Sequence, residues 1–513
     1  MLADQSKQEC GCAPHSWYLE RMRSTAVYDI AERSRLDFAP LLSRRTGCSI
    51  WLKREDTQPV FSFKLRGAYA MMASLDDATR ALGVVAASAG NHAQGVALSA
   101  NHLGCSATIV VPRTTPEIKQ EAIRSLGASL ILEGDGYDEA CTFALRLAEE
   151  TGRCFIPPYD DKEVIAGQGT LGLELLEQNP DLDAVFVPVG GGGLLAGVAL
   201  AVKALRPETK VIGVEPEDSN SMTLSLKAGI RVEMPTTGLF ADGVAVRMPG
   251  AETFRICRNL VDEMVNVSND AICAAIKEIY EDRRAILEPA GALAYAGLQK
   301  WANCKSGLNL AAICSGANVN FDRLRHVSES ASLGEDREAI FAIVIPERPG
   351  SFSALCRDID NHSITEFNYR MADESEAVVF AGVETRDKDD RRELLSFLQA
   401  TRHVVDLTEN EVAKAHLRHM VGGRSAEVAH ERLFHVQFPE RIGALARFLE
   451  ALAGRWNISL FHYRNHGSDI GRVLIGLQVN GEEAEFDQFL HQVGYEFVEV
   501  TNDPALNLFL RHP

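Results

Sequence analysis

Short apolar runs alternate with longer amphipathic segments between about residues 50 and 320. The runs lie at 83–87, 107–112, 184–187, 210–214 and 309–313, and several are apolar at every position. Strands of a parallel sheet that is covered by helices on both faces have this pattern. Between them, 116–126 and 137–149 carry apolar residues at helical spacing. The pattern therefore predicts a doubly wound α/β domain, in which ligands bind beyond the carboxyl ends of the strands.

One uncharged stretch, 184–202, has 19 residues and is as long as a membrane span. Pro188 and the glycines at 190–193 interrupt it, so we expect a buried strand, a loop and a buried helix. The first residues show neither an apolar segment for export nor an arginine-rich one for import. We therefore expect a cytoplasmic protein without membrane contact.

A polar stretch at 328–338 predicts a linker, and an internal repeat follows it. A Pro-Glu-Arg-x-Gly turn at 346–350 recurs at 439–443, and a Phe-x-Tyr-Arg strand end at 367–370 recurs at 461–464, at offsets of 93 and 94 residues. Each copy predicts a βαββαβ unit, with Gly350 or Gly443 exposing N–H groups at a helix start. We expect three domains, at 1–330, 339–410 and 431–503.

Composition narrows the classes of function. The 513 residues, 46% hydrophobic and 24% charged, are typical of a globular protein with about three domains. The net charge of −19 argues against nucleic acid or an anionic membrane as a partner. The 11 cysteines are scattered, which fits a reducing compartment. No Cys or His cluster completes a metal site with Cys10 and Cys12, so we expect no metal there.

Four loops contain candidate chemistry. The first holds Phe63 and Lys64, and the fourth holds Ser315 after the last apolar run. The second leads from an apolar run into a helix, so its unpaired N–H groups suit a carboxylate; it contains Ser88, Ala89, Gly90, Asn91 and His92. Each of these loops alone also has an interpretation without function. Lys64 can be an ordinary exposed lysine, the second loop a simple helix cap with His92 as a structural histidine, and Ser315 a turn former.

The third loop is rich in glycine, so its backbone can wrap closely round a phosphate at the start of a helix. It contains Gly190, Gly191, Gly192, Gly193 and Leu194. No Gly-Lys-Ser/Thr follows and no G-x-G-x-x-G spacing is present, which excludes the common nucleotide loops. A flexible linker is the alternative, and the apolar segments on both sides disfavour it.

In order and spacing, these loops resemble the fold-type II pyridoxal-phosphate (PLP) enzymes of the threonine/serine dehydratase group. The matching segments are 62–64, 88–91, 190–193 and 314–316. The resemblance implies two α/β subdomains, with Lys64 carrying PLP as a Schiff base and serving as the catalytic base. It also implies that the glycine loop holds the phosphate, that Asn91 bonds the 3′-oxygen and that Ser315 bonds the pyridine nitrogen.

The implied reaction is the dehydration and deamination of L-threonine, which gives 2-oxobutanoate and ammonia. The resemblance implies L-serine as a further substrate. Glu288 matches a further family motif and either lines the site or is a structural carboxylate before a proline. Glu215, Glu217 and Asp218 stand where some relatives bind a cation, but their spacing does not require one.

The C-terminal repeat resembles the paired ACT-like regulatory domains of biosynthetic threonine deaminases, so the resemblance covers essentially the whole chain. It implies the first step of isoleucine biosynthesis, inhibition by isoleucine, modulation by valine and a homotetramer. We expect the effectors near the repeated strand ends, at Phe367, Tyr369, Arg370, Phe461, Tyr463 and Arg464. The alternative is that the aromatic residues are core and the arginines are surface charges.

Two other functions stay open at this point. One is β-replacement on the same cofactor, which the C-terminal repeat and the Ser-Phe-Lys context of Lys64 disfavour. The other is a catalytically dead amino-acid sensor, which the intact set of four loops disfavours.

Overall fold

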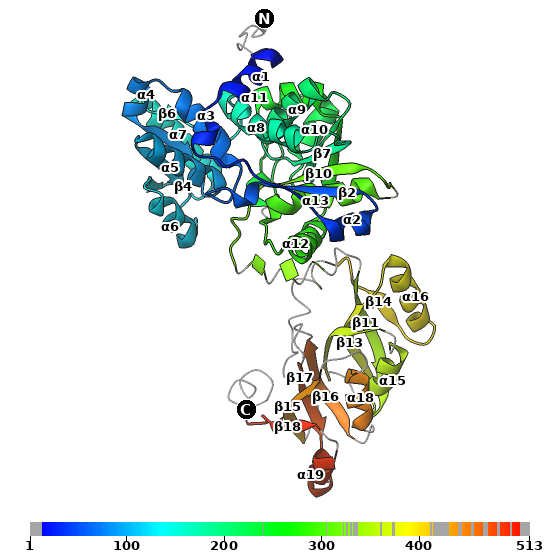
Figure 1. Cartoon of the computed structure of the whole chain (residues 1–513). Helices are drawn as coiled ribbons and strands as arrows, with labels where there is room; N and C mark the ends of the chain where they lie inside the picture. Colours follow the sequence, from blue (N-terminus) through cyan, green and yellow to red (C-terminus); the bar gives the residue numbers. More distant parts are fainter. Residues whose placement is uncertain are drawn as a thin grey trace, which may run out of the picture. The chain divides into compact units, whose positions relative to one another are not determined.

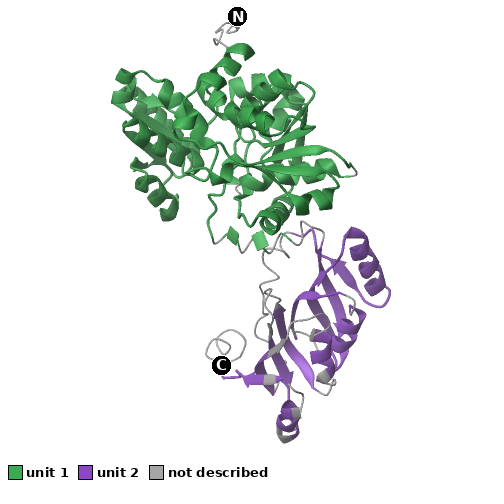
Figure 2. Ribbon diagram, in the orientation of Figure 1, with its two compact units in different colours: residues 1–331 green, residues 332–513 purple. Residues whose placement is uncertain are grey.

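The structure is a computed structural model in which the chain forms two compact units, residues 1–331 and 332–513 (Figure 2). It describes residues 13–502 except 239, 304, 322, 325–326, 329–330, 332–336, 360–361, 372–374, 411–412, 414–429, 440–443, 453–455, 465–469, 480–482 and 493–494. Cys10, Cys12, Gly443 and much of the expected linker therefore lie outside the described residues.

The first unit contains two sheets (Figure 1). The smaller one is entirely parallel, in the order β5–β4–β3–β6. Its strands are β3 (Val84–Ala87), β4 (Ala107–Val111), β5 (Ser129–Leu132) and β6 (Cys154–Phe155), and the accompanying helices are α3 (Lys64–Ser74), α4 (Asp77–Leu82), α5 (Asn91–Leu103), α6 (Glu117–Ser125) and α7 (Tyr137–Thr151). β3 and β4 are buried at every position, as central strands between two helical layers must be.

The larger sheet has the order β1–β2–β10–β7–β8–β9, and only β1 is antiparallel. Its strands are β1 (Leu36–Phe38), β2 (Ser49–Arg54), β7 (Ala184–Pro188), β8 (Lys210–Pro216), β9 (Glu263–Val267) and β10 (Asn309–Cys314). Its helices are α1 (His15–Ser24), α2 (Pro40–Thr46), α8 (Lys162–Gln178), α9 (Gly193–Leu205), α10 (Ser221–Ala228), α11 (Ala251–Leu260), α12 (Asn269–Arg283) and α13 (Pro289–Ala302), with short 3-10 turns η1 (Val27–Asp29), η2 (Glu55–Thr57) and η3 (Asp242–Val244).

The predicted strands and helices of the first unit are confirmed. All five apolar runs are strands, and both amphipathic segments are helices. The uncharged stretch is β7, a loop and the buried helix α9, as expected. In the part of the chain that the structure describes, we find no helix that is long and apolar enough to cross a membrane.

The second unit is built on one antiparallel sheet of eight strands, in the order β14–β11–β13–β12–β16–β17–β15–β18. The first copy comprises β11 (Glu338–Pro346), α15 (Ser351–Asp358), β12 (Ile364–Arg370), β13 (Glu376–Glu384), α16 (Lys388–Gln399) and β14 (Val404–Asp406). The second comprises β15 (Glu431–Pro439), α18 (Ala444–Ala451), β16 (Asn457–Arg464), β17 (Ile470–Gln478), α19 (Glu483–Gln492) and β18 (Glu496–Glu499). Each copy is the predicted βαββαβ unit.

The two copies are joined by the pairing of β12 with β16, in which Phe367 lies opposite Tyr463 and Tyr369 opposite Phe461. These four aromatic side chains are buried in a single core that both copies share. The side chains of Arg370 and Arg464 lie outside the described residues. One hydrophobic core therefore serves the whole repeat.

Candidate active site

Lys64 is the first residue of α3, and its amine lies in a largely dehydrated environment. Its Nζ donates to the carbonyl of Pro158 at 3.0 Å and lies 5.4 Å from the centre of the Phe63 ring. Burial lowers the pKa of Lys64 to about 8, although the negative charge of Glu288 acts in the opposite direction. The amine is therefore much closer to its neutral, nucleophilic form than an ordinary lysine is at neutral pH.

The loop of Lys64, unlike the other three, does not follow a strand directly. β2 ends at Arg54 and the turn η2 follows. Instead, Ser62 forms an isolated β-bridge with Gly316, and the N–H of Phe63 donates to the Ser315 carbonyl at 3.2 Å. These two contacts place the lysine loop beside the loop that follows β10.

A network of buried charged side chains holds α3 in place. The guanidinium of Arg66 makes two bonds to Glu55, of 2.7 and 2.9 Å, and one to Glu174, of 2.7 Å. The amine of Lys53 contacts the other oxygen of Glu174 at 2.6 Å. Two positive and two negative side chains balance here, which is the condition under which charges can be buried. The network fixes the helix that begins with Lys64.

The glycine loop follows β7 and leads into α9. Gly192 has φ +94°, and a Cβ at Gly191 would lie 2.3 Å from the ring of Tyr159, so both positions require glycine. Within the described part of the chain, the N–H groups of Gly191, Gly192, Gly193 and Leu194 donate to no acceptor. Four consecutive free donors at a helix start are a cradle for a phosphate, and these residues thus fit the phosphate of PLP.

The loop after β3 ends at the start of α5. The Ser88 hydroxyl accepts from the N–H of Gly90 at 3.2 Å, and among the described residues the N–H groups of Asn91 and His92 have no acceptor. Burial lowers the pKa of His92 to about 3, and its neutral ring contacts the Ile156 carbonyl through Nε2 at 2.8 Å. The His92 side chain is therefore occupied by a structural bond, while its backbone N–H can contribute to an anion site.

The amide of Asn91 has a fixed orientation. Asn318 Nδ2 donates both to the carbonyl of Val60 at 2.8 Å and to Asn91 Oδ1 at 2.6 Å. Asn91 Nδ2 in turn donates to Glu288 Oε1 at 2.6 Å. Because the chain of bonds begins at a backbone carbonyl and ends at a carboxylate, the orientations of both amides are set, and the second N–H of the Asn91 amide has no acceptor among the described residues.

Ser315 and Glu288 complete the site. The Ser315 hydroxyl is buried and donates to the carbonyl of Ala290 at 3.1 Å. Burial raises the pKa of Glu288 to about 7, and its side chain is packed against Gly316. Glu288 thus lies at the site and also stands before Pro289 at the start of α13, so both expected roles have support.

Glu215 has a structural role. Its carboxylate accepts from the N–H groups of Met222 and Thr223 at 2.9 and 2.8 Å, and from the Thr223 hydroxyl at 2.6 Å. It therefore caps α10. No group of three or more His, Cys, Asp or Glu side chains suited to a metal occurs within the described ranges.

Several contacts of the site were not predicted from the sequence. Pro158, Tyr159 and Thr253 contact Lys64 or the glycine loop from distant parts of the chain. Asn318 also lies in the fourth loop, and we assign it no role from the sequence alone. Its place in a Ser-Gly-Ala-Asn segment directly after β10 was the one available signal, because residues at strand ends face the site.

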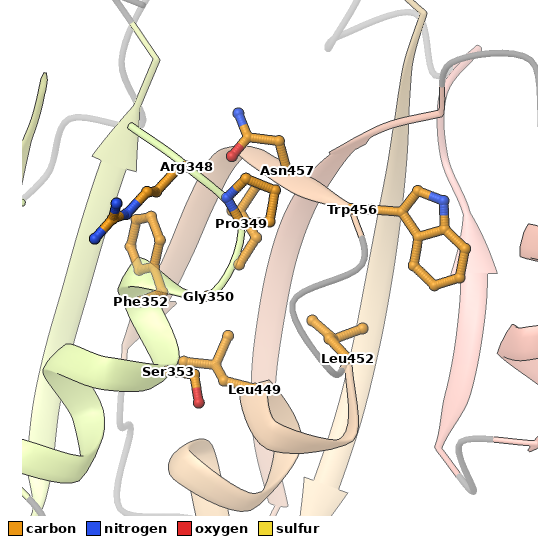
Figure 3. A pocket seen from close by; sticks show the side chains of 10 residues that line it. Arg348, Pro349, Gly350, Phe352, Ser353, Leu449, Leu452, Trp456 and Asn457 are labelled. Carbon is orange, nitrogen blue, oxygen red and sulfur yellow. The ribbon is translucent and has the colours of Figure 1, made fainter. Parts of the chain in front are cut away.

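A second candidate site is a pocket of the second unit, between the start of α15 in one copy and the end of α18 and start of β16 in the other (Figure 3). Its lining residues are Arg348, Pro349, Gly350, Phe352, Ser353, Leu449, Leu452, Trp456, Asn457 and Ile458. Most are apolar, and Arg348 supplies a cation at an exposed position. This combination suits a small ligand with an apolar body and an anionic group.

Comparison with known proteins assigns both parts of the chain. Residues 29–316 match the family of pyridoxal-phosphate dependent enzymes, and residues 329–417 and 422–510 each match the C-terminal regulatory domain of threonine dehydratase. The biosynthetic L-threonine dehydratases of Pasteurella multocida and Escherichia coli are each 50% identical to the chain. Those alignments cover 96% and 99% of this chain and 97% and 100% of the relatives.

Solved structures match about three fifths of the chain. The processed form of threonine deaminase isoform 2 from Solanum lycopersicum is 51% identical with a TM-score of 0.61, covering 62% of this chain and 93% of its own. Maize serine racemase is 33% identical with a TM-score of 0.58, covering 62% and 97%. Together with the geometry, these matches define a fold-type II PLP-dependent enzyme with two C-terminal regulatory domains. The chain belongs to the family of biosynthetic threonine dehydratases, and this membership disfavours both β-replacement and a catalytically dead sensor.

Proposed function

We propose that this chain catalyses the PLP-dependent dehydration and deamination of L-threonine to 2-oxobutanoate and ammonia, with L-serine as a second substrate. This is the first step of isoleucine biosynthesis. The observation that carries the proposal is a lysine amine of lowered pKa whose partner Pro158 adjoins Tyr159, which packs against the glycine loop. Two sets of backbone N–H groups, in the glycine loop and at the start of α5, have no acceptor among the described residues. Such a site can hold a phosphate and a carboxylate, and its lysine can accept a proton from a substrate bound there.

The residues divide the work as follows. Bound PLP supplies an electron sink for charge that develops at the substrate Cα. Gly190–Gly193 and Leu194 would hold its phosphate, the remaining N–H of Asn91 would bond its 3′-oxygen, and Ser315 would bond its ring nitrogen. Ser315 is neutral and would not keep the ring nitrogen protonated, as an aspartate carboxylate would. The negative charge at Cα would then be less stabilised, which favours loss of the β-hydroxyl over other reactions at Cα.

Lys64 is the base at the substrate Cα, because its lowered pKa of about 8 gives it a larger neutral, proton-accepting fraction near neutral pH than an ordinary lysine has. The loop Ser88, Ala89, Gly90, Asn91 and His92 holds the substrate carboxylate. Threonine loses one water from Cα and Cβ, and the released enamine takes up one water to give the keto acid and ammonia.

We further propose that residues 1–330 form the catalytic domain and that 339–410 and 431–503 form regulatory units that bind isoleucine as inhibitor and valine as modulator. The pocket of Figure 3 supports this, since Leu449, Leu452 and Trp456 suit a branched aliphatic side chain. Homotetramer formation stays a prediction from the family resemblance, and sedimentation of the holoenzyme measures it. A cytoplasmic location stays a prediction from the N-terminal sequence.

The aromatic residues that we expected at the effector site do not line this pocket, but Phe352 connects them to it. The Phe352 ring lines the pocket and contacts the rings of Phe367, Tyr369 and Phe461 at centroid distances of 5.6, 4.9 and 6.0 Å. In addition, the Tyr369 hydroxyl donates to Glu347, whose other oxygen accepts from the pocket residue Asn457 at 2.8 Å. A ligand that moves Phe352 or Asn457 would therefore disturb the core between the copies.

The test is a direct assay of the purified holoenzyme. Threonine is added and 2-oxobutanoate is measured, with and without isoleucine, for the wild type and for Lys64→Ala. We expect product from the wild type, less product with isoleucine, and none from the variant. Absence of keto acid from a wild type that has bound PLP would contradict the dehydratase, whereas product that is insensitive to isoleucine and valine would contradict only the regulation.

A further inference from the structure

The segment 158–160 links three parts of the active site that are distant in sequence. The Pro158 carbonyl accepts from Lys64, and the Tyr159 ring packs against Gly191. The carboxylate of Asp160 accepts from the N–H groups of Ala251 and Glu252, at 2.8 and 3.0 Å, and so caps the start of α11. The first turn of α11 is therefore held next to the glycine loop.

From that first turn, Thr253 returns to the glycine loop. Its hydroxyl donates to the carbonyl of Gly191 at 2.6 Å, and the N–H of Gly250 donates to the same oxygen at 3.2 Å. Thr253 is fully buried, with 0% of its surface exposed. The only described partner of its hydroxyl hydrogen is a peptide oxygen of the phosphate cradle.

This contact determines where a neighbouring donor points. In a trans peptide unit the C=O and the N–H point in opposite directions, and the described chain has no cis peptide bond. Since the Gly191 carbonyl is held toward α11, the N–H of Gly192 is directed away from α11. That N–H is one of the four free donors of the cradle.

A glycine pair needs such a restraint more than other residues do. Gly191 and Gly192 have no Cβ to limit rotation of the peptide unit between them, and Gly192 already has φ +94°. If the Gly191 carbonyl were released, the unit could turn and present an oxygen, which repels phosphate, instead of an N–H.

We propose that Thr253 is a positioning residue for the cofactor phosphate, because its hydroxyl holds the Gly191–Gly192 peptide unit with the Gly192 N–H available to the phosphate. The inference rests on the PLP site of the proposed function but not on the substrate or the reaction.

The test measures cofactor binding by the full chain rather than turnover. PLP is added to the apoprotein, its dissociation constant is obtained from tryptophan fluorescence, and the phosphorus-31 resonance of the bound cofactor is recorded. Thr253→Val and Thr253→Ala both remove the hydroxyl but differ in volume. We expect both to bind PLP about tenfold more weakly, as the loss of one buried hydrogen bond predicts, with a shifted phosphorus resonance. Thr253→Ser restores both values.

Thr209→Val is the matched control. The Thr209 hydroxyl is also buried and donates to a backbone carbonyl, that of Leu182, at 2.8 Å. It lies just before the first residue of β8, at the amino ends of the strands, whereas the glycine loop follows the carboxyl end of β7. Its variant should bind PLP as the wild type does. The inference is overturned if Thr253→Val and Thr253→Ala keep the wild-type affinity and resonance, or if Thr209→Val weakens PLP binding equally. A wild type that binds PLP but does not convert threonine would contradict the proposed reaction and leave this result intact.

Discussion

At the scale of single residues, the site depends on how each side chain is surrounded. Lys64 is buried and has one carbonyl partner. Burial removes more favourable hydration from its charged form than from its neutral form, which lowers the pKa. Glu288 is also buried, and its pKa is raised to about 7, so it is mostly a carboxylate at pH 8. Its charge acts to keep the Lys64 pKa from falling further.

The pKa shifts of Lys64 and Glu288 predict how the reactivity of the Lys64 amine in the apoprotein depends on pH. Only the neutral amine of Lys64 adds to an aldehyde, so the rate of reaction with pyridoxal should rise with pH and level off above about 8, instead of near the ordinary lysine value of 10.5. Pyridoxal is used because it has no phosphate that titrates. In Glu288→Gln the inflection should move to lower pH, since a charge that raises the Lys64 pKa is gone. A rate that still increases steeply at pH 10 would contradict the lowered pKa.

The sequence predicts some of these residues and not others, for a physical reason. Lys64, Asn91, the glycine loop and Ser315 lie in loops whose composition is unusual, so the loops can be recognised one by one. Tyr159 and Thr253 are ordinary residues in ordinary segments. They matter through contacts with residues about 30 to 60 positions away along the chain, and such contacts appear only once the fold brings the segments together.

At the scale of elements, a strand could be predicted from the sequence where its residues are apolar and buried along its length. β3, β4, β7 and β10 are buried along almost their whole length and were found as apolar runs. β5 and β9 are only partly buried, and β6 has two residues, so they have no such signal. The sequence does not show β2 as an apolar run, because β2 ends in Lys53 and Arg54, which are charged although buried.

The buried charges beside β2 lead to a prediction about stability. Arg66→Met should leave Glu55 and Glu174 with too little positive charge, at a cost of about 3–5 kcal/mol in the free energy of unfolding. As a control, Arg113→Ala removes a pair with Glu133 in which the side chains are 61% and 38% exposed. That loss should cost about 0–1 kcal/mol. Guanidinium denaturation of the apoproteins measures both, and equal costs would show that the network does not hold α3.

At the scale of the whole molecule, catalysis and regulation lie in separate compact units. The Solanum lycopersicum and maize structures match 62% of this chain while 93% and 97% of their own chains are covered. The catalytic part is therefore found without a regulatory pair. Regulation requires only that an effector favour one state of the molecule, by ~1–3 kcal/mol in typical cases.

The separation predicts variants that change regulation alone. Arg348→Ala removes the exposed cation of the pocket, so the isoleucine concentration for half-inhibition should rise about tenfold if the guanidinium binds the effector carboxylate. Without effector, kcat and KM for threonine should stay as in the wild type. Arg392→Ala is the control, since Arg392 is 72% exposed on α16, away from the pocket lining. An unchanged isoleucine response in Arg348→Ala would exclude this role.

The pairing of β12 with β16 has a consequence for how the regulatory part depends on protein concentration. In one βαββαβ unit alone, β12 or β16 would be an open edge that invites pairing with another chain. Here the partner strand is supplied by the same polypeptide, so the contact forms in a unimolecular step. Dilution cannot separate the two copies, and a cell that makes little of this protein still makes complete regulatory pairs.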